Sequence, residues 1–190
     1  MIPFLKKFIL CILVSTYSLL SIAQKGLEPS NINPEWTQAY PPFKIAGNLY
    51  YVGTYELASY LIVTSEGSIL INSGLSTSTP IIRANIETLG FKLGDIKILL
   101  TTQAHYDHVG ALAEIKKLTG AKMFADVGDV GALQDGGRSD YALTDSSSLY
   151  TPIGVDRVVY DRQTIRLGEM QILILHHPGH TRGSSEYIHW

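Results

Sequence analysis

The chain is almost free of cysteine: Cys11 is the single thiol among 190 residues. Cys11 also lies in an apolar N-terminal run that we expect to be removed, so the mature chain would have none. Disulfides and thiolate metal ligands are thereby excluded, and a metal site would have to use His, Asp, Glu or amide side chains. The sequence also lacks internal repeats, and its charged residues amount to only 17%.

The first residues have the pattern of a secretory signal peptide rather than of a folded element. Lys6 and Lys7 precede the apolar run 8–20, and the small-x-small sequence 21–23 follows it as a cleavage site. The run is shorter than the roughly 20 apolar residues of a transmembrane helix, which leaves an uncleaved anchor as the lesser alternative. We therefore predict that residues 1–23 direct export to the periplasm and are then cleaved.

The mature chain, 24–190, carries no excess of positive charge. Cleavage removes two of the 15 basic residues, which leaves 13 against 17 acidic residues and a net charge of −4. Such a balance disfavours nucleic acid and anionic membrane surfaces as partners. We expect a monomer without stable membrane association.

Apolar patterning predicts an alternation of strands and helices. Residues 48–54, 59–64 and 68–72 are short runs with β composition, and a helix follows with Thr79 as N-cap and Pro80 in its first turn. The apolar run 96–101 is the next predicted strand, and helix 111–118 follows, with Leu112, Ile115 and Leu118 facing the sheet. The order strand, helix, strand, helix predicts a βαβ crossover and an α/β fold with partly parallel pairing.

The second half of the chain is less regular. We predict strands at 122–125, 158–167, 170–176 and 183–188, and a short helix from Asp126 to about Gln134.

Residues 135–156 form a long predicted loop rich in Gly, Ser and Asp. Loops of this length are uncommon unless they are functional or disordered. We interpret Asp140, Tyr141 and Asp145 within it as solvated side chains.

Four potential metal ligands lie in the loop between the predicted strand 96–101 and the helix 111–118. In an extended segment, side chains two residues apart share a face, which would place Gln103, His105 and Asp107 together. His108, at the turn into the helix, would point elsewhere. The pattern favours two adjacent metal positions, one at Gln103 and His105 and the other at Asp107 and His108.

A second chemical feature is the Pro-Gly-His-Thr stretch at 178–181, which follows a predicted strand. Gly179 would let the backbone bring His180 close to a ligand. We do not expect His176 or His177 to be ligands. Histidine, carboxylate and amide donors from two strand ends suit zinc, which would serve hydrolysis of an acyl or amide-like bond.

The motifs Gln-Ala-His-Tyr-Asp-His at 103–108 and His-Pro-Gly-His-Thr-Arg-Gly-Ser at 177–184 resemble those of the metallo-β-lactamase superfamily. The glutamine in place of the first histidine, with the stretches 45–54 and 58–63, is similar to the GOB-type branch of the third subclass. The resemblance implies a four-layer αββα sandwich, of which this chain would supply the N-terminal half to two-thirds, so that domain 24–190 would be incomplete at its C-terminus.

The resemblance also implies roles for individual residues. Gln103, His105 and His180 would hold a first zinc ion, while Asp107 and His108 would hold a second one whose third ligand this chain lacks. A zinc-bound hydroxide would open the β-lactam ring of penicillins, cephalosporins or carbapenems, conferring antibiotic resistance, and Asp107 would be the catalytic residue that orients it. As a neutral ligand, Gln103 would make the first site weak.

Asn72 stands where many members of the superfamily have an aspartate. The charged partner that such an aspartate would supply around the metal ligands is therefore missing or different. Two other functions stay open. One is hydrolysis of a thioester, lactone or phosphoester on the same fold; the other is an inactive, truncated product.

Overall fold

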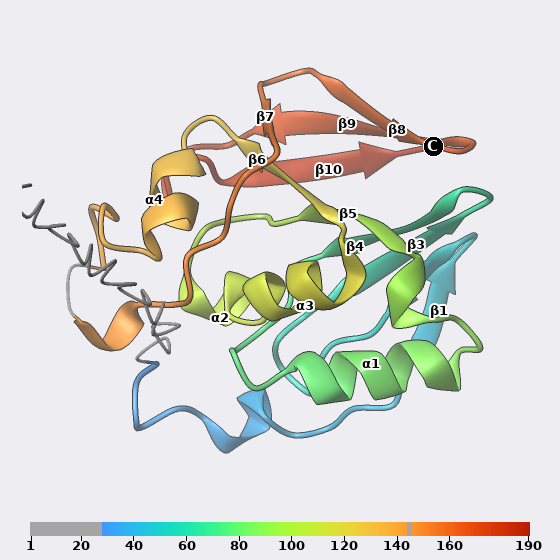
Figure 1. The fold of residues 1–190 in the computed structure, drawn as a ribbon, viewed down its shortest axis with the longest axis horizontal. Coiled ribbons are helices and arrows are strands. Elements are labelled where there is room, and N and C mark those ends of the chain that lie inside the picture. Colours follow the sequence, from blue (N-terminus) through green and yellow to red (C-terminus); the bar gives the residue numbers. More distant parts are fainter. Residues whose placement is uncertain (1–27, 144–145) are drawn as a thin grey trace, which may run out of the picture.

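The computed structural model describes residues 28–143 and 146–190 (Figure 1). The predicted signal peptide and Asp145 lie outside the described residues. The elements follow one another as η1 (Pro34–Trp36), β1 (Phe43–Ala46), β2 (Leu49–Tyr51), β3 (Tyr60–Thr64), β4 (Gly67–Ile71), α1 (Thr79–Thr88), η2 (Leu93–Asp95), β5 (Ile96–Leu100), α2 (Tyr106–Val109), α3 (Leu112–Thr119), β6 (Lys122–Asp126), α4 (Val130–Asp135), η3 (Ser146–Ser148), β7 (Arg157–Val159), β8 (Thr164–Leu167), β9 (Met170–His176) and β10 (Ser185–His189).

Two sheets form the core of the fold. The larger has seven strands in the order β1 to β7, and the smaller has the order β10-β9-β8. Strands β1 to β4 form an antiparallel meander, whereas β4, β5, β6 and β7 are parallel. The predicted βαβ crossover is confirmed, because α1 connects β4 to its parallel neighbour β5.

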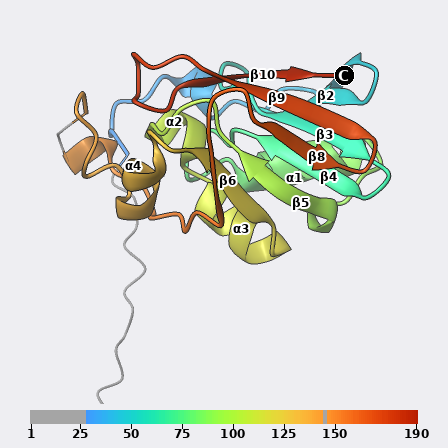
Figure 2. The ribbon, with the colours of Figure 1, turned by 90° about the horizontal axis from the view of Figure 1, so that it is seen from above.

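Both faces of the large sheet are buried, one against helices and the other against the small sheet. Leu61, Leu70 and Leu99 pack with residues of α1 and α3, whereas Ile62 and Ile69 pack with the small sheet. This is the period-two alternation of a strand buried on both faces. The result is a layer of helices, the large sheet and the small sheet, as Figure 2 shows.

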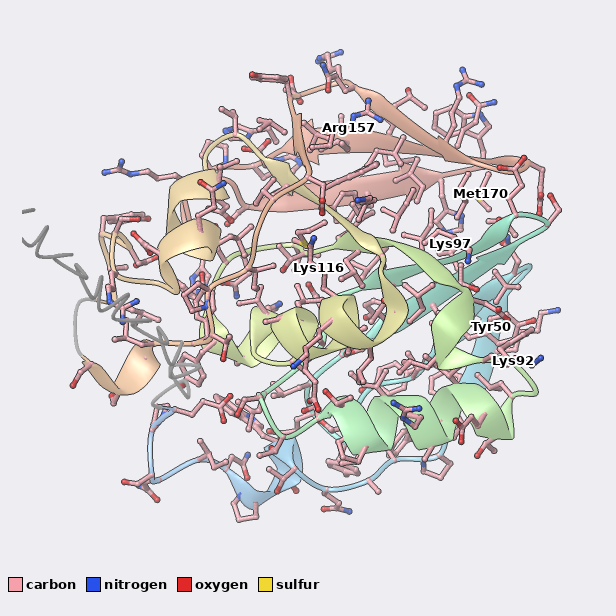
Figure 3. All side chains as sticks on the ribbon, in the orientation of Figure 1. Tyr50, Lys92, Lys97, Lys116, Arg157 and Met170 are labelled. Carbon is pink, nitrogen blue, oxygen red and sulfur yellow. The ribbon has the colours of Figure 1, made fainter. Side chains whose placement is uncertain are left out.

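These layers agree with the predicted α/β sandwich. In the described part of the chain, no helix covers the outer face of the small sheet, so three of the four layers of the expected αββα arrangement are seen among these residues. Side chains fill the space between the layers (Figure 3). Tyr50 packs against the core between the large sheet and the helices, and Met170 belongs to the core between the two sheets.

Two predicted strands are wrong in their extent. The strand at 48–54 is predicted too long, because β2 covers only Leu49–Tyr51. The unpredicted strand β1 precedes it and forms a hairpin with β2 around Gly47, whose φ is +52°. The strand at 158–167 is in fact β7 and β8, which belong to different sheets. The chain turns between them, where Arg162 has a φ of +61°, a value uncommon outside glycine.

The predicted helices exist, with corrections at their ends. The N-cap position of α1 is occupied by Ser78 rather than by the predicted Thr79. Helix α4 starts at Val130, so its N-cap position is Asp129 rather than the predicted Asp126. Leu118 was expected to face the sheet but is 50% exposed, because only Leu112 and Ile115 of α3 point inward. Gly120 ends α3 in the left-handed conformation.

The carboxyl ends of the parallel strands meet at one edge of the large sheet, which is where α/β folds place their binding sites. The loop after β5 and the loop after β9 both lie at this edge, where Ser185 N donates a hydrogen bond to Thr102 O at 2.8 Å. In the described ranges, no helix has the length and apolar character needed to cross a membrane.

Candidate metal centre

The loop after β5 is extended only as far as His105. His105 has φ −89° and ψ 155°, and the short helix α2 starts at the next residue. Asp107 and His108 therefore occupy neighbouring positions in a helical turn, with His108 Nε2 3.6 Å from Asp107 Oδ2. The prediction that Asp107 shares an extended face with His105 is wrong, because the backbone turns helical before it reaches Asp107.

Asn72 fixes the start of this loop from the end of β4. Its Oδ1 accepts a hydrogen bond from Thr102 N at 2.9 Å, and its Nδ2 donates one to Thr102 Oγ1 at 3.1 Å. Thr102 Oγ1 in turn lies 3.2 Å from His108 Nδ1. Asn72 has a φ of +62°, which asparagine tolerates better than most residues. The neutral side-chain amide of Asn72 is thus connected to His108 through the hydroxyl of Thr102.

His105 and His180 meet although 75 positions separate them in the chain. His105 Nδ1 lies 3.0 Å from His180 Nε2, and the ring centroids are 4.6 Å apart. His105 is buried, whereas His180 is exposed on the loop after β9. The structure therefore brings together the two histidines that the sequence motifs singled out.

Asp129 fixes the loop that carries His180. Its carboxylate accepts hydrogen bonds from Thr181 Oγ1 and from Gly183 N, both at 2.8 Å. Burial raises the pKa of Asp129, and these two donors oppose the rise. Asp129 precedes α4, so this helix and the His180 loop are locked together. The sequence carried no signal for this role of Asp129.

Asp140 corrects the interpretation of the long loop as solvated. Its side chain is buried, and Oδ2 lies 3.1 Å from His105 Nε2. Oδ1 accepts hydrogen bonds from Ala142 N at 2.7 Å and Leu143 N at 2.8 Å. Burial alone would raise the pKa of Asp140, but these backbone donors and His105 hold it below its ordinary value. No local pattern in the sequence links Asp140 to a histidine 35 positions away.

Tyr141 is exposed, as expected, yet it also contacts the site. Its hydroxyl donates a hydrogen bond to Gly179 O, and the guanidinium of Arg182 lies 5.8 Å from its ring centroid. The 136–143 segment therefore contacts the His180 loop through the exposed side chain of Tyr141.

The remaining histidines near the site have other partners. His176 Nδ1 lies 3.0 Å from Asp126 Oδ2, and the exposed His177 Nε2 lies 3.1 Å from Glu186 Oε2. Among residues 28–143 and 146–190, no three His, Cys, Asp or Glu side chains form a group that could hold a metal ion. A first site therefore depends on the amide of Gln103.

The donors fit a small divalent cation at that first site. Nitrogen ligands about 2.0–2.1 Å from a tetrahedral zinc ion are about 3.3 Å apart, close to the separation of the facing His105 and His180 nitrogens. Gln103 Oε1 is buried and has no hydrogen-bond partner among the residues that the structure describes. A buried acceptor without a partner is costly, and a cation would satisfy it.

His108 belongs to the same electrostatic cluster. Burial lowers the pKa of His108, Asp107 opposes this, and the nearby His105 and His180 lower the pKa further. A neutral imidazole is the form that binds a metal. Asp107 and His108 are thus a candidate second pair of donors beside the first set.

Comparison with known proteins points to one family. A family model described as the Metallo-beta-lactamase superfamily matches residues 56–188. The class B3 di-zinc metallo-beta-lactamase LRA-12 from an Alaskan soil metagenome is 56% identical, with a TM-score of 0.83 over 85% of this chain and 61% of that one. The metallo-beta-lactamase GOB-18 from Elizabethkingia meningoseptica is 55% identical, with a TM-score of 0.86 over 88% of this chain and 62% of that one.

Curated relatives are more distant and carry another name. A probable hydroxyacylglutathione hydrolase of Schizosaccharomyces pombe is 29% identical over 145 residues, which cover 75% of this chain and 47% of that protein. A hydroxyacylglutathione hydrolase of Rhodospirillum rubrum is 30% identical over 112 residues, 59% of this chain and 35% of that protein. The chain thus spans less than half the length of these relatives and about three-fifths of the two solved structures.

Proposed function

This chain belongs to the metallo-beta-lactamase superfamily, and on that premise we propose that it serves zinc-dependent hydrolysis of the β-lactam amide bond. The observation that carries the proposal is the facing pair His105 and His180 beside the unpartnered Gln103 Oε1. Identities of 55–56% to two metallo-beta-lactamases, one of them named a di-zinc enzyme, support it.

In this proposal Gln103, His105 and His180 hold the first zinc ion, and Asp107 and His108 contribute to a second. Zinc would lower the pKa of a water ligand toward 7 and polarise the carbonyl of the substrate. Asp107, partly exposed beside His108, would accept a hydrogen bond from the attacking water and orient it.

Thioester hydrolysis is the second candidate, because the curated relatives are named hydroxyacylglutathione hydrolases. Their identity of 29–30% is about half that of the two metallo-beta-lactamases. The two substrate classes can be compared directly by offering the same purified chain a chromogenic cephalosporin and a hydroxyacyl glutathione thioester.

The test of the proposed activity uses the purified chain with added zinc. We expect opening of the cephalosporin above the rate of a His105→Ala control, and little release of free thiol from the thioester. A cephalosporin rate equal to that of His105→Ala would contradict the activity of this chain, which is the outcome expected of an inactive product. For the second site, the zinc content per chain should fall in the double variant Asp107→Ala, His108→Ala.

We further propose that the protein is exported and acts on antibiotics in the periplasm, as the pattern of residues 1–23 suggests. The expected mature N-terminus is Gln24. N-terminal sequencing of the protein recovered from the periplasmic fraction tests this, and retention of Lys6 and Lys7 would contradict it. A monomer without nucleic-acid or stable membrane partners remains our prediction.

A further inference from the structure

The carboxylate of Asp140 is held in one orientation behind His105. Its Oδ1 is occupied by two backbone donors, Ala142 N and Leu143 N, within a loop that turns at Gly136 and Gly137. Both glycines have positive φ and are buried. Only Oδ2 is left for another partner, and it faces His105 Nε2 at 3.1 Å.

This contact favours one nitrogen of His105 as the carrier of the proton. An ionised carboxylate only accepts hydrogen bonds, so a short contact with Nε2 requires hydrogen on Nε2. In the neutral ring, Nδ1 then carries a lone pair and no hydrogen. Nδ1 is the atom that faces His180 Nε2 at 3.0 Å. The opposite tautomer would place two acceptors against each other at Asp140 and a hydrogen where a cation would bind.

We propose that Asp140 is a positioning residue of the metal centre: it holds His105 in the Nε2-protonated form, so that Nδ1 presents its lone pair to the cation shared with Gln103 and His180. The inference rests on the metal site of the proposed function. It does not depend on which substrate is hydrolysed. The general rule that carboxylates orient metal-binding histidines gives its expected size, a tenfold to hundredfold change in metal affinity.

A purely structural role for Asp140 has to be separated from this one. Asp140 organises its own loop through Ala142 and Leu143, and it lines a cavity of about 250 Å³ together with Asp129, Tyr141 and Arg182. If Asp140 only organised its loop, replacing it would change zinc binding only to the extent that it changed thermal stability. It would not select a tautomer in the folded protein.

The first measurement is made on the zinc-free full chain by long-range proton–nitrogen NMR of the histidine rings. In the wild type we expect His105 to carry its proton on Nε2, and in Asp140→Ala we expect a mixture of tautomers or the Nδ1-protonated form. An Nδ1-protonated His105 in the wild type would overturn the proposal, even where Asp140→Ala fails to fold. This readout is independent of activity.

The second measurement is the zinc dissociation constant, by competition with a chromogenic chelator. We expect Asp140→Ala to bind zinc tenfold to hundredfold more weakly and Asp140→Glu to recover part of the loss, while the exposed control Glu87→Ala on α1 stays unchanged. Wild-type affinity in a folded Asp140→Ala would refute the role of Asp140. Absence of zinc binding by the wild type would instead refute the metal site of the proposed function, and the NMR result would still decide the tautomer.

Discussion

Gly183 shows how a single residue supports the position of His180. A Cβ at Gly183 would lie 2.6 Å from Asp129 N and 2.7 Å from Asp129 Cγ, distances that no real Cβ tolerates. At Gly179 a Cβ would meet no heavy atom of the described residues within 4 Å. The close backbone approach within the protein therefore occurs at Gly183, against the residue that precedes α4. That Gly179 lets the backbone bring His180 close to a ligand stays a prediction.

The two glycines make a matched pair of variants. Gly183→Ala should push Asp129 away from Thr181 and lower the free energy of unfolding by about 1–3 kcal/mol, as overpacking does. It should also weaken zinc binding, because the His180 loop is displaced. Gly179→Ala should stay within about 0.5 kcal/mol of the wild type. Urea unfolding and zinc titration measure both effects, and equal losses in the two variants would contradict the argument.

Among the elements, α3 and β6 are joined by one carboxylate. Asp156 accepts a hydrogen bond from Lys116 Nζ at 2.7 Å and another from Met123 N at 2.8 Å. Lys116 projects from α3, as labelled in Figure 3. Burial alone would raise the pKa of Asp156, but Lys116 and Met123 N lower it below its ordinary value. The stability that Asp156 contributes therefore depends on pH.

A carboxyl group with a lowered folded-state pKa stabilises the fold above its unfolded pKa of about 3.9, and this contribution is lost as the pH falls through the folded-state pKa. Asp156→Asn should therefore lower the free energy of unfolding near pH 7 by about 1 kcal/mol, a modest value since the ion pair is partly exposed. The difference from the wild type should shrink below about pH 4. Urea unfolding at both pH values checks this, with Glu87→Gln as control; a difference independent of pH would contradict it.

At the scale of the whole molecule, the two sheets are joined at both ends. At the metal-centre end, Tyr187 on β10 donates a hydrogen bond to Thr101 O at 2.6 Å. At the opposite end (Figure 1), Glu169 Oε2 accepts hydrogen bonds from Ser65 Oγ at 2.6 Å and Ser65 N at 3.1 Å. The apolar core between them includes Ile62 and Ile172. Docking of the small sheet therefore brings the His180 loop to the His105 loop.

Tyr187→Phe tests the connection at the metal-centre end. The carbonyl of Thr101 would lose its donor, which should lower the free energy of unfolding by about 1–2 kcal/mol. Burial raises the pKa of Tyr187, in keeping with a hydroxyl that stays protonated and donates. Tyr160→Phe is the matched control, because Tyr160 is 50% exposed. Urea denaturation of both variants measures the effect, and equal stability of the two would rule out this connection.

Several features of the site follow from the sequence alone because they are local. The types of candidate metal donor in the 103–108 loop and at His180 are read directly, and the alternation of strands and helices follows from short-range apolar periodicity. The error at 158–167 shows the limit of such patterns. β7 and β8 both contain β-branched residues, and only their long-range pairing assigns them to different sheets.

The tertiary structure alone decided how those donors are used. It placed His105 Nδ1 against His180 Nε2 and His105 Nε2 against Asp140, across separations of 75 and 35 positions. Sequence periodicity reports which face of a strand or helix is buried, but not which distant side chain meets it. That meeting depends on the docking of one sheet on the other and on backbone hydrogen bonds in the 136–143 loop. The types of the candidate ligands were thus determined by the sequence, whereas the tertiary fold decided how His105 and His180 are oriented toward each other.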